Sequence, residues 1–269
     1  MTVHRRVLAA GTIVPALGAS LLLLFLVLPI GELVVQGGVP GIRRFGSDGE
    51  LRSALALTAL TATVATLLGV ALGTPLAYLL ARRPFRGRAV LSALLDLPLV
   101  IPHPVAGIAL LLVLGRESAV GGALLLAGIR VVGTPVGIVA AMLFVSAPLF
   151  VSGAREAFAR VDPRYESVAR TLGDGAWRVF RRITLPLAGR GLLASAVVMW
   201  ARAVSEFGAI VILTYNPKVV SVLSYDRFTT FGLGEAIPAA AVLVLLALVP
   251  LALLRALRGE AITNSGGMG

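Results

Sequence analysis

The sequence has no cysteine, only two histidines and, among 24 basic residues, a single lysine, Lys218. The absence of cysteine excludes disulfides, thiol catalysis and cysteine metal sites, and His4 and His103 cannot build a histidine metal cluster between them. Charged residues make up 14% of the chain, whereas an ordinary soluble domain has about a quarter. The chain therefore has too little polar surface to be a water-exposed globule of 269 residues.

Long hydrophobic runs take the place of that polar surface. Hydrophobic residues account for 58% of the chain, and the mean hydropathy is +0.95. A helix that crosses a bilayer needs about 20 mostly apolar residues, and six runs qualify: 7–30, 54–81, 89–114, 134–151, 191–213 and 236–257. The first run is longer than the apolar core of a cleaved signal peptide, so it is interpreted as an uncleaved span. We predict one all-α domain over residues 1–269, a multi-pass protein with six transmembrane helices in the cell membrane.

The distribution of charge predicts the orientation of these helices. The net charge is +11, which a nucleic-acid-binding surface could also explain. Sixteen basic residues, however, fall at the N-terminus, in loops 82–88 and 152–190 and near the C-terminus, against seven on the opposite side. The positive-inside rule then places both termini in the cytoplasm, as an even number of spans requires. The basic excess is an orientation signal, and we expect no nucleic-acid partner.

Loop 152–190 contains an amphipathic segment with clear helix boundaries. Asp162 suits the N-cap, Pro163 the first helical position and Gly173 the residue after the end. Apolar residues recur between them at helical spacing, namely Tyr165, Val168, Ala169 and Leu172. So short a helix is marginal alone and needs a surface to pack against. Periodicity leaves two surfaces open: anionic lipid headgroups and a groove on a cytoplasmic partner.

The same loop resembles the cytoplasmic motif of permease subunits of ATP-binding-cassette importers. That motif reads Glu-Ala-Ala, three residues, Gly, nine residues and Ile-x-Leu-Pro; this chain has 167–169, then Gly173, then 183–186 at the same spacing. Ser167 stands at the Glu position, and Glu166 lies one residue earlier. The resemblance implies a coupling helix that docks on an ATPase subunit, but this departure leaves no basis for carrying over a family salt bridge. The residues implied are Glu166, Ser167, Val168, Ala169, Arg170, Leu172, Gly173, Ile183, Leu185 and Pro186.

Two further segments are similar to the molybdate/tungstate and sulfate branch of these permeases. They are 101–111 (IPHPVAGIALL) and 201–209 (ARAVSEFGA), and Ser205 together with 225–229 favours the archaeal tungstate/molybdate form. The resemblance covers about residues 50–257. It implies the type I importer permease fold and import of a tetrahedral oxyanion, tungstate or molybdate, delivered by an extracytoplasmic binding protein. It also implies a second copy of this chain and two ATPase subunits that hold ATP and magnesium, with no cofactor on this chain.

A few charged and helix-breaking residues lie within the hydrophobic runs. Arg202 and Glu206 are four residues apart and would share a helical face. Intramembrane charges face a bundle interior or an aqueous path. The pair is therefore either a structural lock or, functionally, a gate or a weak cationic contact for an oxyanion such as tungstate. The prolines around His103 predict a broken helix that could line the path. The residues expected at the path or gate are Arg202, Glu206, Asp96, Pro102, His103 and Pro104.

Two other functions remain alternatives. A sulfate or thiosulfate permease belongs to the same class, whereas a secondary transporter would show an internal repeat and acidic couplers within the membrane. No clear repeat is present, and Asp96 and Glu206 are the only candidates for such couplers. Lys218 lies in no glycine-rich phosphate-binding loop. We therefore predict a transport subunit rather than an enzyme, with ATP hydrolysis on a separate chain.

Overall fold

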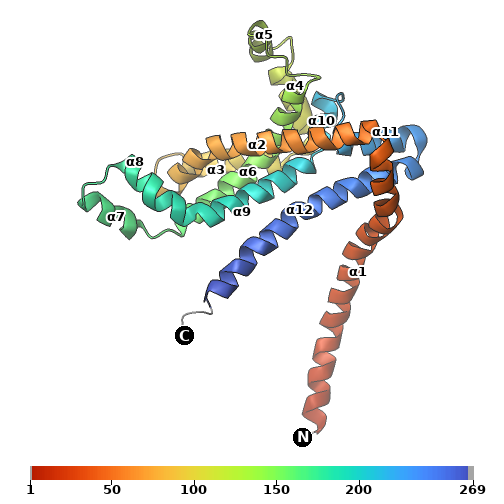
Figure 1. The fold of residues 1–269 in the computed structure, drawn as a ribbon. Helices are drawn as coiled ribbons and strands as arrows, with labels where there is room; N and C mark the ends of the chain where they lie inside the picture. Colours follow the sequence, from red (N-terminus) through yellow and green to blue (C-terminus); the bar gives the residue numbers. More distant parts are fainter. Residues whose placement is uncertain (1, 266–269) are drawn as a thin grey trace.

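The computed structural model describes the backbone of residues 2–265 and the side chains of 15–43, 46–250, 252, 254 and 255. In that part of the chain every regular element is a helix, as predicted (Figure 1). The elements are α1 (Thr2–Ser47), α2 (Gly49–Arg82), α3 (Arg88–Val100), α4 (His103–Leu114), α5 (Ala119–Leu126), α6 (Pro135–Ala159), α7 (Pro163–Thr171), α8 (Ala176–Val179), the π-helix η1 (Phe180–Thr184), α9 (Leu185–Val204), α10 (Gly208–Leu213), α11 (Val220–Phe231) and α12 (Leu233–Ser265).

Five stretches of the described chain are long and apolar enough to cross a membrane: Pro15–Arg43, Gly49–Arg82, Pro135–Ala159, Ala176–Val204 and Leu233–Pro250. A sixth crossing is complete only if α3 and α4 count together, because these helices meet at an angle of 114°. The predicted break in this run is confirmed, and it falls between Val100 and His103. The chain thus has five or six candidate spans.

The prediction of one continuous helix over 191–213 is wrong. Helix α9 ends at Val204 and α10 begins at Gly208, because the chain turns at 205–207 and the Glu206 carboxylate accepts the backbone N–H of Ala209. Hydropathy does not detect this turn, since apolar residues continue on both sides of it. The short helices α5 and α11 lie outside all the predicted runs.

Helices α2, α6 and α9 lie side by side and form the body of the bundle (Figure 1). Small residues bring their backbones close together, as is usual between membrane helices. A Cβ atom added at Gly73 of α2 would collide with Phe150 of α6. Gly153 and Gly191 are similarly tight against Ser195 and Ala157 across the α6–α9 contact. These three helices connect the loop that carries α7 and α8 to the far end of the bundle, where α10 and α11 lie.

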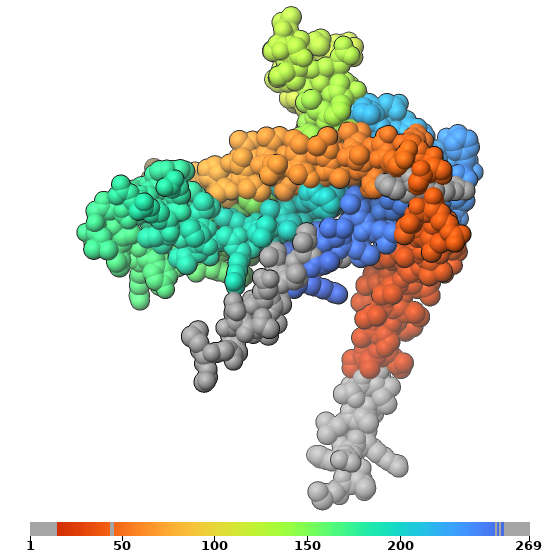
Figure 2. Space-filling view, viewed as in Figure 1, coloured from red at the N-terminus to blue at the C-terminus, as the bar shows by residue number. Residues whose placement is uncertain are grey.

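The C-terminal part of α1 packs on the first turns of α12, and the rest of α1 projects away from the bundle (Figures 1 and 2). At the contact, Gly37 and Gly41 fit against Ile237, Pro238 and Ala241. Earlier in α1 the large apolar side chains of the described residues are mostly exposed, for example Phe25 at 74%. A surface of this kind is compatible with lipid or a protein neighbour rather than with water. The helix also continues to Ser47, well past the predicted boundary at 30.

Candidate functional site

Helix α7 forms where the sequence predicted a short amphipathic helix. The Asp162 carboxylate accepts the backbone N–H of Arg164 at 2.9 Å, and Pro163 is the first helical residue. Gly173, just past the end, has φ of +93°, a conformation that glycine adopts without steric cost. These local signals fix both ends of the helix independently of its packing.

The buried Glu166 carboxylate attaches α7 to the bundle. It is 5% exposed, and its Oε1 accepts hydrogen bonds from Arg82 Nε and Thr184 Oγ1, each at 2.9 Å. Arg170 lies 3.5 Å from the other carboxylate oxygen. Arg82 also donates to the Val161 carbonyl at 2.8 Å. One carboxylate thus joins α7 to the end of α2 and to η1.

Position 166 therefore carries a structural ion pair that sequence reasoning did not foresee. Ser167, at the family's Glu position, is exposed and donates to the carbonyl of Pro163 at 3.2 Å. In the sequence Arg82 is only an orientation signal, because nothing there connects it with a residue 84 positions away. A buried partner for Glu166 could have been anticipated only from the general need to pair buried carboxylates.

Three of the four residues of the apolar stripe of α7 face away from the bundle. Tyr165 and Val168 are each 59% exposed and Leu172 is 82% exposed, whereas Ala169 is buried. Burying such side chains stabilises a complex by about 1.5–3 kcal/mol each. The predicted docking face is therefore free to meet another surface.

The second half of the loop is held by aromatic packing. Phe180 packs edge-on against Tyr78 of α2 with ring centroids 4.9 Å apart, and Tyr78 packs against Phe158 of α6 at 5.4 Å. Leu185 joins the same hydrophobic cluster, Pro186 is exposed and Ile183 is half-buried. The Ile-x-Leu-Pro residues thus lie where η1 leads into α9.

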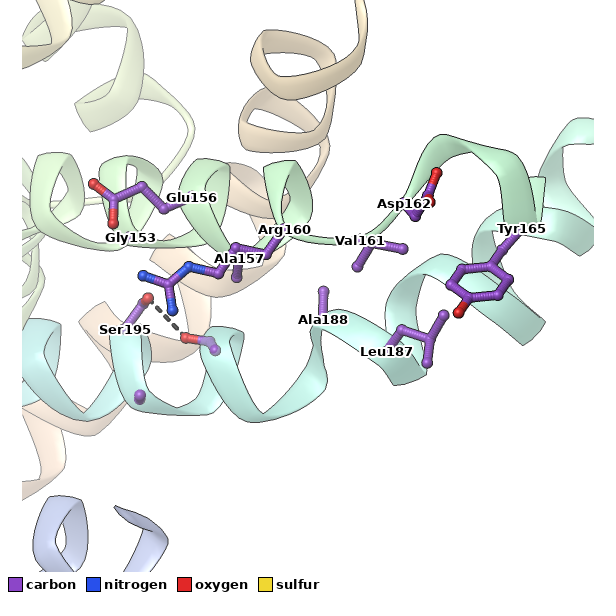
Figure 3. Close-up of a pocket in the computed structure, with 12 residues that line it drawn as sticks. Gly153, Glu156, Ala157, Arg160, Val161, Asp162, Tyr165, Leu187, Ala188 and Ser195 are labelled. Atoms are coloured by element: carbon purple, nitrogen blue, oxygen red, sulfur yellow. Dashed lines mark hydrogen bonds between the residues drawn. The ribbon is translucent and has the colours of Figure 1, made fainter. Parts of the chain in front are cut away.

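A groove of about 620 Å³ opens between α6, α9 and the start of α7 (Figure 3). The Arg160 side chain reaches along α6 toward Ser195, and the Tyr165 ring lies near Leu187 of α9. Gly153 and Glu156 of α6 also line the groove. The groove adjoins the exposed stripe of α7 through Tyr165, so both belong to one continuous surface.

Three of the predicted path residues form a polar cluster in the bundle. Arg202 Nη2 donates to Glu206 Oε2 at 2.8 Å and lies 2.6 Å from Nε2 of His103. Arg202 Nη1 also contacts the Ser205 hydroxyl at 3.3 Å. Glu206 is 1% exposed, so its charge is paired and hydrogen-bonded, as a buried carboxylate requires. The arrangement needs an unprotonated Nε2 on His103.

The cluster lies where two interrupted helices meet. Arg202 is in the last turn of α9, where a cation is stabilised by the helix dipole, and Glu206 precedes α10, where an anion is stabilised. His103 is the first residue of α4, after the break that contains Pro102. A Cβ at Gly208 would collide with His103 and Pro104, so α10 packs tightly on this break.

Asp96 lies apart from this cluster. Its carboxylate accepts a hydrogen bond from Ser152 at 3.5 Å, and it shares a small pocket with Arg155 and Ser92. Among the side chains that the structure describes, no arginine lies within salt-bridge distance of Asp96. Of the six path candidates, Asp96 is therefore separate. The other five lie together, because Pro102 and Pro104 flank His103 in the chain.

A second charged cluster, not predicted from the sequence, joins α11 to the start of α2. Arg227 is 2.7 Å from Asp48 and 3.3 Å from Glu50, and Lys218 is 2.6 Å from Asp226. The Arg227 guanidinium holds the pKa of Asp48 below its usual value, and these carboxylates raise the pKa of Arg227. Asp48 also caps α2 by accepting the N–H of Leu51 at 2.9 Å. The cluster ties the two elements together at the end of the bundle opposite α7.

Comparison with known proteins gives a consistent result. Residues 69–259 match the family described as binding-protein-dependent transport system inner membrane component. The chain is 39% identical, over 91% of its length and 94% of the relative's, to a molybdate/tungstate transport system permease protein of Thermococcus kodakarensis. It is 44% identical to the Pyrococcus furiosus protein of the same description, over 74% of this chain and 75% of that one. A sulfate transport system permease protein of Escherichia coli is 32% identical over 89% of each chain.

Solved structures share the fold at low sequence identity. A chain of a bacterial ABC transporter that imports the acidic polysaccharide alginate superposes with a TM-score of 0.69 at 18% identity, over 97% of both chains. A chain of the MetNI methionine ABC transporter gives a TM-score of 0.62 at 16% identity, over 78% of this chain and 95% of that one. At such identities the likeness concerns the fold alone.

Proposed function

The chain belongs to the family of binding-protein-dependent transport system inner membrane components, and we propose that it translocates a tetrahedral oxyanion, tungstate or molybdate. As a member of that family it is a permease subunit of an ATP-binding-cassette importer. The observation that carries the substrate assignment is the identity of 39–44% with archaeal molybdate/tungstate permeases, compared with 32% for sulfate permeases. A sulfate or thiosulfate importer is the second candidate, favoured by that 32% match over most of the chain.

The proposed complex contains two copies of this chain, two ATPase subunits and one extracytoplasmic binding protein. ATP and magnesium would bind to the ATPases and not to this chain. Support comes from the exposed stripe of Tyr165, Val168 and Leu172 on a helix that the buried Glu166 holds in place. A stripe of this kind suits insertion into a groove of a partner. Both termini and the α7–α8 loop would lie in the cytoplasm, in agreement with the arginine bias.

The path proposed for the oxyanion passes the cluster of His103, Arg202 and Glu206. A dianion that enters the membrane loses hydration and needs a compensating positive charge. Arg202 would provide a weak one, because Glu206 neutralises part of its charge. An unpaired arginine would hold the anion too tightly for release. Glu206, at 2.8 Å from Arg202, moderates this attraction, and the helix breaks on either side supply positions where the backbone can move.

Two measurements test this proposal. Calorimetry of the cognate binding protein with tungstate, molybdate and sulfate should show tighter binding of the first two; a preference for sulfate would replace the substrate assignment. Co-purification of the chain with its cognate ATPase should yield a stable complex. Failure to assemble, or uptake driven by an ion gradient without an ATPase, would favour a secondary transporter instead.

A further inference from the structure

A second groove, of about 780 Å³, lies between the end of α2 and the loop of α7 and α8. Three arginines line it, Arg82, Arg83 and Arg170, together with the aromatic rings of Trp177 and Phe180. It is separate from the groove of Figure 3, which lies between α6 and α9. The docking face of α7 does not account for this groove either.

The residues of α7 divide between the two surfaces by helical position. Pro163, Ser167 and Arg170 line the groove, and their spacing of four and three residues places them on one face. Val168 and Leu172, on the exposed stripe, project from the other side of the helix. The stripe and the groove therefore lie on opposite faces of α7.

The groove has an excess of positive charge. Glu166 is the only acid among the described residues that line it, and its carboxylate is already paired with Arg82 and Arg170. Arg83 is exposed, and no carboxylate of the described side chains lies within salt-bridge distance of it. Arg170 is 54% exposed. Arg83 is thus available to an anion, and Arg170, although it contacts Glu166, leaves about half of its side chain exposed to one.

The walls of the groove change character along α2. Pro75 and Tyr78 line its apolar end, and Pro75 lies about 10 Å before Arg82 at 1.5 Å per residue. Because α2 is a candidate membrane span, the apolar end lies deeper than the arginines. Trp177 is 71% exposed and stacks on Phe180 with centroids 5.6 Å apart. Exposed tryptophan beside arginine is typical of the boundary between headgroups and acyl chains.

We propose that this groove binds one anionic phospholipid of the cytoplasmic leaflet. The phosphate contacts Arg83 and Arg170, and the upper acyl chain lies along Pro75, Tyr78 and Trp177. An inorganic anion would leave the apolar wall of the groove uncovered. An acidic protein surface would contact the arginines but would not extend below the lipid headgroups to that wall. The inference rests on the proposed function only in placing the loop at the cytoplasmic face. The bound lipid supports α7 from the side opposite its docking stripe.

The test is native mass spectrometry of the full chain extracted from nanodiscs of equal phosphatidylcholine and phosphatidylglycerol. Bound phosphatidylglycerol should exceed phosphatidylcholine. The Arg83→Gln/Arg170→Gln variant should weaken retention about 25-fold, at about fivefold for each arginine. Arg181→Gln/Arg182→Gln is the matched control, since both arginines are exposed residues of the same loop outside the groove. The control should retain phosphatidylglycerol as the wild type does.

Several outcomes would overturn the lipid assignment. They are equal loss in the control, unchanged retention in the groove variant, and release of the lipid by millimolar inorganic phosphate. Loss of the lipid on assembly with the ATPase would instead make the groove a protein interface. Arg83→Gln alone keeps the assay decisive if the double variant unfolds, because Arg83 has no acidic partner among the described side chains. This single variant should weaken retention about fivefold. Binding-protein-stimulated transport is not needed for any readout, so failure here is distinct from failure of the proposed function.

Discussion

Arg202 lies 2.6 Å from Nε2 of His103, a residue 99 positions earlier in the chain. Both residues sit at helix ends, one in the last turn of α9 and the other at the start of α4. Since Glu206 binds the same guanidinium at 2.8 Å, one arginine joins two interrupted helices. Arg202 therefore contacts both the start of α4 and the turn that precedes α10.

Replacing Arg202 by Gln should destabilise the permease and reduce transport. The change leaves the carboxylate of Glu206, 1% exposed, without its ionic partner, which costs about 3 kcal/mol. The Arg202→Gln/Glu206→Gln variant should recover most of that stability, because no unpaired charge remains. Thermal unfolding in detergent measures the difference. Normal transport by the single variant would remove Arg202 from the path.

A change at Glu166 should have a much larger effect than a change at the neighbouring Ser167. Glu166→Gln loses the ion pairs to Arg82 and Arg170, and breaking a buried pair costs about 3–5 kcal/mol. Ser167→Ala removes an exposed hydroxyl and should change stability by less than about 0.5 kcal/mol. Protection of the α7 backbone in hydrogen exchange provides the measurement. Equal effects of the two variants would contradict the anchoring role of position 166.

These two sites show what the sequence can and cannot reveal. Asp162, Pro163 and Gly173 act on backbone within two residues of themselves, so the limits of α7 could be predicted locally. The Glu166–Arg82 pair joins residues 84 positions apart and depends on the packing of α2 against the loop. The break after Val204 likewise depends on a carboxylate that caps Ala209, which hydropathy cannot detect. The proximity of Arg202 and Glu206 was predicted, although a turn and not a continuous helix brings them together.

The exposed stripe of α7 predicts a variant that separates folding from assembly. Leu172→Ser changes a side chain that is 82% exposed, so the unfolding temperature of the isolated permease should be unchanged. If Leu172 is buried in the ATPase, association should weaken by about 10- to 100-fold, from about 1.5–3 kcal/mol of lost burial. Thr171→Ala, off the stripe, is the control. Binding of the labelled ATPase to both variants in nanodiscs gives the comparison, and equal affinities would exclude the stripe as the docking face.

The Arg227–Asp48 pair predicts a dependence of stability on pH. Arg227 lowers the pKa of Asp48 from 3.8, so the pair stabilises the folded state fully above that value. This stabilisation is lost as pH falls below 3.8 through the lower folded pKa. The stability difference between wild type and Arg227→Gln should therefore be constant from pH 5 upward and shrink below about pH 4. Thermal unfolding at pH 3 to 7 measures it; a difference that grows in acid would contradict the assignment.

The most direct test of the central claim is uptake of labelled tungstate into proteoliposomes that contain this chain, its cognate ATPase and its binding protein. The account predicts uptake that requires both ATP and the binding protein and that unlabelled molybdate inhibits more strongly than sulfate. Uptake that persists without ATP, or that an ion gradient alone drives, would contradict it.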